Sequence, residues 1–284
     1  MQISAEEDAQ IAELKREVLK LQGLREAPTN CWSAQYYTKG RLLCWLRGRN
    51  NNVAKAATWA VECIEYLDQQ PERAARFVAT RKSFHDVREE HILAGLFGID
   101  RLGASVLYRK DGLIDVDRFA KLTSVDFFCD GEEYDAMVFY DSLYRESLRV
   151  GKYISSRVSV VDLQGSALSR TMRNMKVFDK QLSRFPHKES PTPEGLRIIL
   201  IRNTPKYFTR VWSMTKWMVT KRDQARIHLF PASEAGEAKF RDELFKHVDP
   251  NQVPTDFGGN CDCPWTFCGR SSADFKHKLN EKAD

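Results

Sequence analysis

The sequence predicts an α/β fold in which a mostly parallel sheet follows an all-helical N-terminal region. Three observations lead to this prediction. Strand-like and helix-like segments alternate from residue 104 to residue 247, which is the pattern of parallel strands joined by crossover helices. Residues 5 to 68 contain amphipathic helices and no strand-like run. The chain has 284 residues, of which 42% are hydrophobic, so it can bury a core of its own.

Three helices are predicted before residue 70. The first covers residues 5 to 25, because its apolar residues recur at intervals of three and four on an otherwise charged segment. It carries only about two heptads of this spacing, so we interpret it as docked on its own domain and not as a coiled coil. The second covers residues 39 to 49 and ends at Asn50-Asn51-Asn52, and the third runs from Val53 to Asp68. A further helix is expected to begin at Pro71.

The second part of the chain contains four expected strands and four main helices. Short apolar runs bounded by turn residues predict the strands Ala104–Tyr108, Val158–Val161, Arg197–Ile201 and Arg226–Phe230. The expected helices cover residues 130 to 149, 168 to 182, 205 to 221 and 233 to 247. The second of these helices is indicated by the helical spacing of Leu168, Met172, Met175 and Leu182, and it ends near Pro186.

Charge and composition exclude some classes of function. The chain carries 44 basic and 39 acidic side chains, an excess of +5 that is too small for a dedicated nucleic-acid binder but compatible with phosphate-bearing partners such as lipid headgroups. The first residues are acidic where a targeting peptide would be basic, and the longest apolar runs are too short to span a bilayer. The seven cysteines are therefore expected to be reduced thiols in the cytoplasm.

Motifs for catalysis and metal binding are missing from the sequence. It contains no glycine-rich dinucleotide motif, no phosphate loop, no His-Glu-x-x-His and no Gly-x-Ser-x-Gly elbow. An enzyme acting on a lipid would have to use Ser166, His228 and Asp162, which form no recognisable motif. Cys261, Cys263 and Cys268 lack an adjacent fourth ligand of the kind that tetrahedral zinc needs. We therefore expect no catalytic residues, no metal and no cofactor.

Five segments, in order along the chain, match a known family pattern. They are Leu42–Arg49 with Val53–Ala56, then Val160–Gly165, Ile201–Pro205, Ala225–Leu229 and Val253–Gly259. Together they resemble the CRAL-TRIO lipid-binding family, which includes the fungal phosphatidylinositol/phosphatidylcholine transfer proteins and α-tocopherol transfer protein. The resemblance implies a helical N-terminal subdomain at residues 1–84, a lipid-binding domain at 85–260 and a Cys-rich, charged tail at 261–284.

The resemblance also implies a sheet that floors an apolar lipid cavity beneath a movable helical lid. The cavity positions of the family fall on Tyr108, Ser159, Val161, Ile199 and Ile201. The lid falls on residues 205 to 221, whose large apolar side chains are spread around the helix and flanked by basic residues. The expected lid and membrane contacts are Phe208, Val211, Trp212, Met214, Trp217, Met218 and Val219. Such a helix is normally buried core, but a lid touching lipid and membrane would have the same pattern.

The choice of lipid headgroup stays open between several ligands. In relatives that bind phosphatidylinositol, the resemblance places headgroup contacts at Arg49 and Glu194 and at a Thr-x-x-Lys whose two positions are occupied here by Asp223 and Arg226. The alternative is that these are surface charges in weak ion pairs. The phosphatidylcholine pattern places small hydroxyl residues around Ser159, and Arg157 stands where one of them would be.

The resulting hypothesis is a cytoplasmic, peripherally membrane-associated protein that binds or transfers one lipid molecule. Its expected partners are this lipid and, transiently, a membrane surface, with no nucleic acid. The alternative is a regulatory module that uses the same fold to bind a protein or a membrane surface without transferring lipid. The two differ in occupancy, because a module with a collapsed cavity would carry no lipid.

Overall fold

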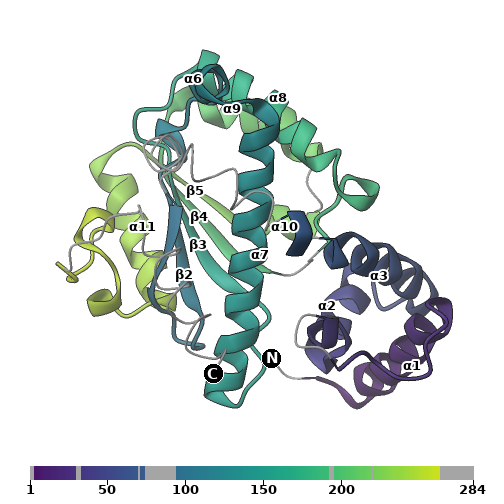
Figure 1. Ribbon diagram of the computed structural model, residues 1–284. Coiled ribbons are helices and arrows are strands. Elements are labelled where there is room, and N and C mark those ends of the chain that lie inside the picture. Colours follow the sequence, from purple (N-terminus) through teal and green to yellow (C-terminus); the bar gives the residue numbers. More distant parts are fainter. Residues whose placement is uncertain are drawn as a thin grey trace, which may run out of the picture. The chain divides into compact units, whose positions relative to one another are not determined.

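The computed structural model describes residues 3–29, 33–69, 71–73, 94–191, 195–218 and 221–262 (Figure 1). Four residues singled out in the sequence, Glu194, Val219, Cys263 and Cys268, lie outside these ranges, as does most of the helix expected from Pro71. The chain forms two compact units. The helical unit comprises residues 1–79, 129–156 and 178–195, and the sheet unit comprises residues 80–128, 157–177 and 196–284.

The helical unit begins with three helices whose ends are set by local sequence. These are α1 (Ala5–Leu21), α2 (Lys39–Gly48) and α3 (Val53–Asp68), with a 3-10 turn, η1 (Ser33–Tyr37), before α2. Ser4 forms a capping box with Glu7, while the side chains of Thr38 and Asn52 cap the other two helices. The predicted spacing buries one stripe of α1, and the helix ends four residues before the predicted limit. Most of α7 (Val125–Val150) also belongs to this unit.

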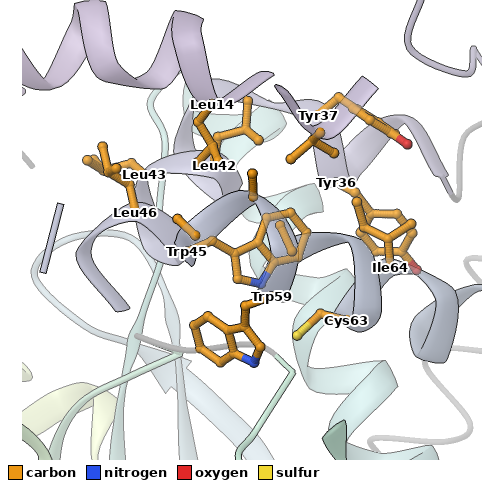
Figure 2. Close-up of a cluster of buried hydrophobic side chains, with 14 of the residues drawn as sticks. Leu14, Tyr36, Tyr37, Leu42, Leu43, Trp45, Leu46, Trp59, Cys63 and Ile64 are labelled. Carbon is orange, nitrogen blue, oxygen red and sulfur yellow. The ribbon is translucent and has the colours of Figure 1, made fainter. Parts of the chain in front are cut away.

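The core of the helical unit is formed where α1, α2 and α3 meet (Figure 2). Leu14 of α1, Leu42 and Trp45 of α2, and Ile64 of α3 are buried together with Tyr36 of η1. The Trp45 indole N–H donates to the Pro191 carbonyl oxygen at 3.1 Å, so its one polar atom is satisfied inside the core.

The sheet unit contains one five-stranded sheet in the order β1-β2-β3-β4-β5. Its strands are β1 (Ala94–Ile99), β2 (Ser105–Arg109), β3 (Arg157–Asp162), β4 (Leu196–Thr204) and β5 (Ile227–Pro231). β2 to β5 pair in parallel, as predicted, and β1 pairs antiparallel with β2. β1 was not predicted, because its two glycines and its lack of a β-branched run hide the strand signal.

One face of the sheet is covered by α11 (Glu234–His247), as Figure 1 shows. Phe240 and Leu244 of α11 pack against the alternate side chains of the strands, among them Val160 and Leu200. The 3-10 turns η5 (Pro250–Gln252) and η6 (Thr255–Phe257) follow and place Phe257 in the same core. The side chains on this face therefore form a closed hydrophobic core together with α11 and Phe257.

The remaining helices of the sheet unit follow the carboxyl ends of the strands. They are η2 (Asp111–Leu113), α6 (Val116–Leu122), the first part of α8 (Leu168–Leu182), α9 (Lys206–Thr215), η4 (Lys216–Met218) and α10 (Lys221–Gln224). The prediction of one continuous helix over residues 205 to 221 is wrong: α9 ends at Thr215, and a 3-10 turn follows. The Lys216 carbonyl oxygen at this break accepts a hydrogen bond from Gln224 Nε2 at 2.7 Å. None of the described helices is long and apolar enough to cross a membrane.

Candidate functional site

The face of the sheet opposite α11 carries apolar side chains that are not fully covered. Strand register places Val161, Ile201 and Leu229 in one row and Ile199 and Ile227 in the next, all on this face. Each of these five side chains is partly exposed. Parallel sheets normally bury both faces, so partly exposed aliphatic side chains on the inner strands β3 and β4 are unusual and make this face a candidate binding surface. We call these five residues the open face.

The open face ends toward β2. Arg157, Ser159 and Leu107 lie on the same side of the sheet but are buried. Arg157 is only 1% exposed, and its Nη1 atom donates to the Ser105 hydroxyl oxygen at 3.0 Å. The predicted cavity residue Ser159 is therefore beside the accessible apolar surface and does not contribute to it. Arg157 fills the space at this end of the strand.

Tyr108 lies on the other face of the sheet from the remaining predicted cavity residues. It pairs in register with Val160, and its ring lies 4.7 Å from that of Phe257, in the core under α11. Burial raises the pKa of its hydroxyl above the ordinary value. The expectation that Tyr108 is a cavity residue is therefore wrong, because side chains alternate along a strand and register puts Leu107, not Tyr108, beside Ser159.

The helix α9 has one protected side and one exposed side. Val211 is buried, and Phe208 and Trp212 are partly buried. On the other side Met214 is 71% exposed and Trp217 of η4 is 78% exposed, the two largest exposures of any large hydrophobic side chain described. Lys206, Arg210 and Lys216 are also exposed. The structure thus divides the predicted lid residues into an inner and an outer set, while the side chain of Met218 and all of Val219 are outside the described part.

The first turn of α9 is held to α8 by hydroxyl groups. The Tyr207 hydroxyl donates to the Ser166 Oγ atom at 2.9 Å and lies 3.2 Å from the Thr171 Oγ1 atom. Ser166 is thus engaged by Tyr207, while Asp162 accepts hydrogen bonds from the Gln164 N–H and the Asn203 side chain. These contacts do not join Ser166 and Asp162 to His228 as a hydrolytic triad requires.

The predicted headgroup residues divide between the two units. In the helical unit, the Arg49 guanidinium stacks on Trp59 at 3.4 Å and forms an ion pair with Glu189 at 2.8 Å. In the sheet unit, Arg226 lies 3.4 Å from the Asp223 carboxylate and donates to the Leu196 carbonyl oxygen at 3.3 Å. Sequence reasoning missed both Trp59 and Glu189. Glu189 is 140 residues from Arg49 in sequence, and only the fold could show that they meet.

Other candidate groups in the helical unit do not suit an apolar ligand. A surface hollow of about 420 Å³ is lined by Glu62, Glu65, Tyr66, Gln69, Pro186 and His187, a set that includes two carboxylates. Burial raises the pKa of the Cys63 thiol to about 12, which keeps it neutral and unreactive. Among the described residues, no group of three or more His, Cys, Asp or Glu side chains could hold a metal ion.

The fold is therefore a mostly parallel sheet with one apolar face closed by α11 and the other partly exposed. The family model of the CRAL/TRIO domain matches residues 89–259, which is more than half of the chain. The protein therefore belongs to the CRAL/TRIO family, and the family and fold expected from the sequence motifs are confirmed.

Relatives known by sequence match part of the chain, and one solved structure matches nearly all of it. Three Arabidopsis thaliana proteins, the phosphatidylinositol/phosphatidylcholine transfer proteins SFH11, SFH9 and SFH12, are 20%, 25% and 22% identical over 70%, 60% and 78% of this chain. The matches span 52%, 28% and 39% of those relatives' own lengths. The crystal structure of Sfh5 superposes with a TM-score of 0.59 at 13% identity, covering 99% of both chains, which shows the shared fold.

Proposed function

We propose that this protein binds a single lipid molecule on the open face and transfers it between membranes. The observation that carries the proposal is the partial exposure of Val161, Ile199, Ile201, Ile227 and Leu229 on a sheet that is otherwise closed. The printed names of the plant relatives, which are phosphatidylinositol/phosphatidylcholine transfer proteins, support a phospholipid as the ligand. In this proposal the lipid-binding domain is the predicted segment 85–260, and exchange involves no catalytic step or cofactor.

The free energy of lipid transfer explains why a lid is needed. Moving a lipid with about 30 methylene groups into water costs roughly 25 kcal/mol of free energy, so transfer must avoid exposing its chains to water. Passing from a membrane into an apolar cavity is nearly balanced. We propose that α9 is the lid, because its inner residues Phe208 and Val211 are protected while Met214 and Trp217 face outward and can enter a membrane interface.

For the headgroup we propose phosphatidylinositol, with Arg49, Glu194, Asp223 and Arg226 as candidate contacts. Trp59 and Glu189 hold the Arg49 guanidinium in place, while Arg226 offsets the negative charge of Asp223. Phosphatidylcholine is the weaker candidate, because Arg157 occupies the position of a hydroxyl residue in the family's choline-lipid pattern. The protein would act in the cytoplasm and associate peripherally with membranes.

Native mass spectrometry of the full chain tests this proposal. The protein is incubated with a cell lipid extract, purified again and analysed intact, and the bound mass is identified. We expect one lipid per chain, with phosphatidylinositol enriched over its share of the extract. A different single lipid would keep the binding function and reject the four headgroup contacts. A folded protein without any bound lipid would reject the function and favour the regulatory-module alternative.

A further inference from the structure

The first two turns of α8 carry exposed apolar side chains, since Leu168 and Met172 are each 48% exposed. In these turns two polar residues face the fold: Arg170 donates to the Gly112 carbonyl oxygen at 2.9 Å, and Asn174 donates to the Ile114 carbonyl oxygen at 3.0 Å. A surface helix normally turns its large apolar residues toward the core. Here the inward polar groups are hydrogen-bonded, and Leu168 and Met172 are left available to a partner.

Other exposed groups extend Leu168 and Met172 into a surface. Leu113 of η2 is about half exposed and lies next to Gly165, since a Cβ atom on that glycine would be 3.1 Å from the leucine side chain. Asp117 of α6 forms an ion pair with Arg173 of α8, and Lys121 follows one turn later on the same side of α6. Figure 1 shows α6, α8 and α9 gathered at one end of the sheet. We call Leu113, Leu168 and Met172, with Lys121 and Lys176, the anchor surface.

The charge around the anchor surface is strongly positive. Residues 113–122, 165–177 and 205–216, which form this end of the sheet unit, contain eight basic and only two acidic side chains. Both acids are engaged: Asp115 caps α6 and Asp117 pairs with Arg173. The whole chain carries 44 basic and 39 acidic side chains, so the excess positive charge of the protein is concentrated here. Exposed apolar side chains among exposed cations match a membrane interface that contains anionic lipid.

We propose that the anchor surface binds bilayers containing anionic lipid and holds the protein at the membrane independently of the lid. The inference rests on the proposed function, because a transfer protein must dock before its lid opens. It adds a second contact to that of Met214 and Trp217. The anchor surface lies outside α9, so it stays in place when α9 moves. The two are neighbours, because the Tyr207 hydroxyl group of α9 donates a hydrogen bond to Ser166, two residues before Leu168. Membrane composition then determines where exchange takes place.

Co-sedimentation with vesicles tests the proposal. The vesicles contain either phosphatidylcholine alone or phosphatidylcholine with about 30 mol% phosphatidylserine. The buffer contains about 0.1 M salt, so that charge interactions are only partly screened. We expect at least tenfold stronger binding of the wild-type chain to the anionic vesicles. The Lys121→Ala/Lys176→Ala variant should lose about fivefold in affinity per cation removed. The Leu168→Asp/Met172→Asp variant should lose at least tenfold, and high salt should remove most of the preference.

Matched controls carry the same substitutions elsewhere in the sheet unit. Leu102→Asp replaces a half-exposed leucine in the turn after β1, and Lys239→Ala removes an exposed cation on α11. Both should bind as the wild type does. Equal binding to the two vesicle types, or full binding by the Lys121→Ala/Lys176→Ala variant, would overturn the proposal. It would also be overturned if the wild type were a dimer that Leu168→Asp/Met172→Asp dissociates, since the surface would then join two copies of the chain.

Failure of this inference can be separated from failure of the proposed function. Native mass spectrometry of each variant reports the bound lipid without a membrane present. A wild-type chain that carries lipid but shows no preference for anionic vesicles rejects only the anchor surface. A chain that prefers anionic vesicles but never carries lipid rejects the transfer function and leaves the anchor surface in place. If the Leu168→Asp/Met172→Asp variant fails to fold, the binding of the Lys121→Ala/Lys176→Ala variant to anionic vesicles tests the proposal by itself.

Discussion

Replacing Glu133 by alanine is expected to lower the free energy of unfolding by about 3 kcal/mol, because the change breaks a buried charge cluster. The Glu133 side chain is 4% exposed and lies between two arginines, 3.2 Å from Arg184 and 3.3 Å from Arg73. Burial opposes the charge on Arg184, but hydrogen bonds to Asp130 and Glu133 raise its pKa above the ordinary value. Removing the buried carboxylate would leave two guanidinium groups that have lost their shared partner.

Thermal unfolding measures this effect. The expected loss corresponds to a fall in the melting temperature of about 6 to 12 °C for a chain of this size. Glu133→Gln keeps one acceptor and should lie between the alanine variant and the wild type. Glu17→Gln is the matched control, because the Glu17 side chain is 42% exposed and lies 3.8 Å from the exposed Lys20 ammonium group, so the change should alter stability by less than about 0.5 kcal/mol. If Glu133→Ala melts with the wild type, the cluster does not stabilise the helical unit.

Replacing Met214 and Trp217 together by aspartate is expected to reduce lipid exchange with vesicles by a factor of a hundred or more. Both side chains are exposed, so their removal costs the folded protein little. In the proposed mechanism they enter the membrane interface, where burying each is worth about 1.5 to 3 kcal/mol. Losing two such contacts, and placing carboxylates at that depth, removes the docked state from which exchange proceeds.

The exchange assay needs an equally exposed control and a check on the fold. Leu148→Asp supplies the control, because Leu148 of α7 is 66% exposed and lies outside the proposed lid. It should exchange lipid at the wild-type rate. The Met214→Asp/Trp217→Asp variant should keep the melting temperature of the wild type. Normal exchange by this variant would show that α9 is not the lid, and a large fall in its melting temperature would show that these residues are part of the core.

Elements defined by local sequence were predicted well. α3 begins at Val53 and ends at Asp68 as predicted, because an asparagine cap and a continuous amphipathic pattern define it within one segment. The parallel strands β2 to β5 were found for a similar reason, since each is a short apolar run between turns. β1 was missed because Gly95 and Gly98 weaken its pattern and its pairing with β2 is what stabilises it.

Features that depend on distant segments were not visible in the sequence. Tyr108 was wrongly expected in the cavity, because register between β2 and β3 decides which alternate side chains share a surface. Leu168 and Met172 helped to mark a helix, but their exposure was not visible in the sequence, because hydrogen bonds from Arg170 and Asn174 to η2 and its following residue set how this part of α8 lies. Family motifs indicated Arg49 as a candidate headgroup residue, which stays a prediction, and its stacking on Trp59 and pairing with Glu189 came only from the fold.

Transfer of lipid between two vesicle populations tests the central claim most directly. Donor vesicles carry radiolabelled phosphatidylinositol, acceptor vesicles carry none, and the wild-type chain is added in catalytic amount. The account predicts that label moves to the acceptors at a rate proportional to protein concentration, with many lipids moved per protein molecule. A rate equal to that without protein, from a folded chain that binds the same vesicles, would contradict the account and leave a protein that docks on membranes without carrying lipid.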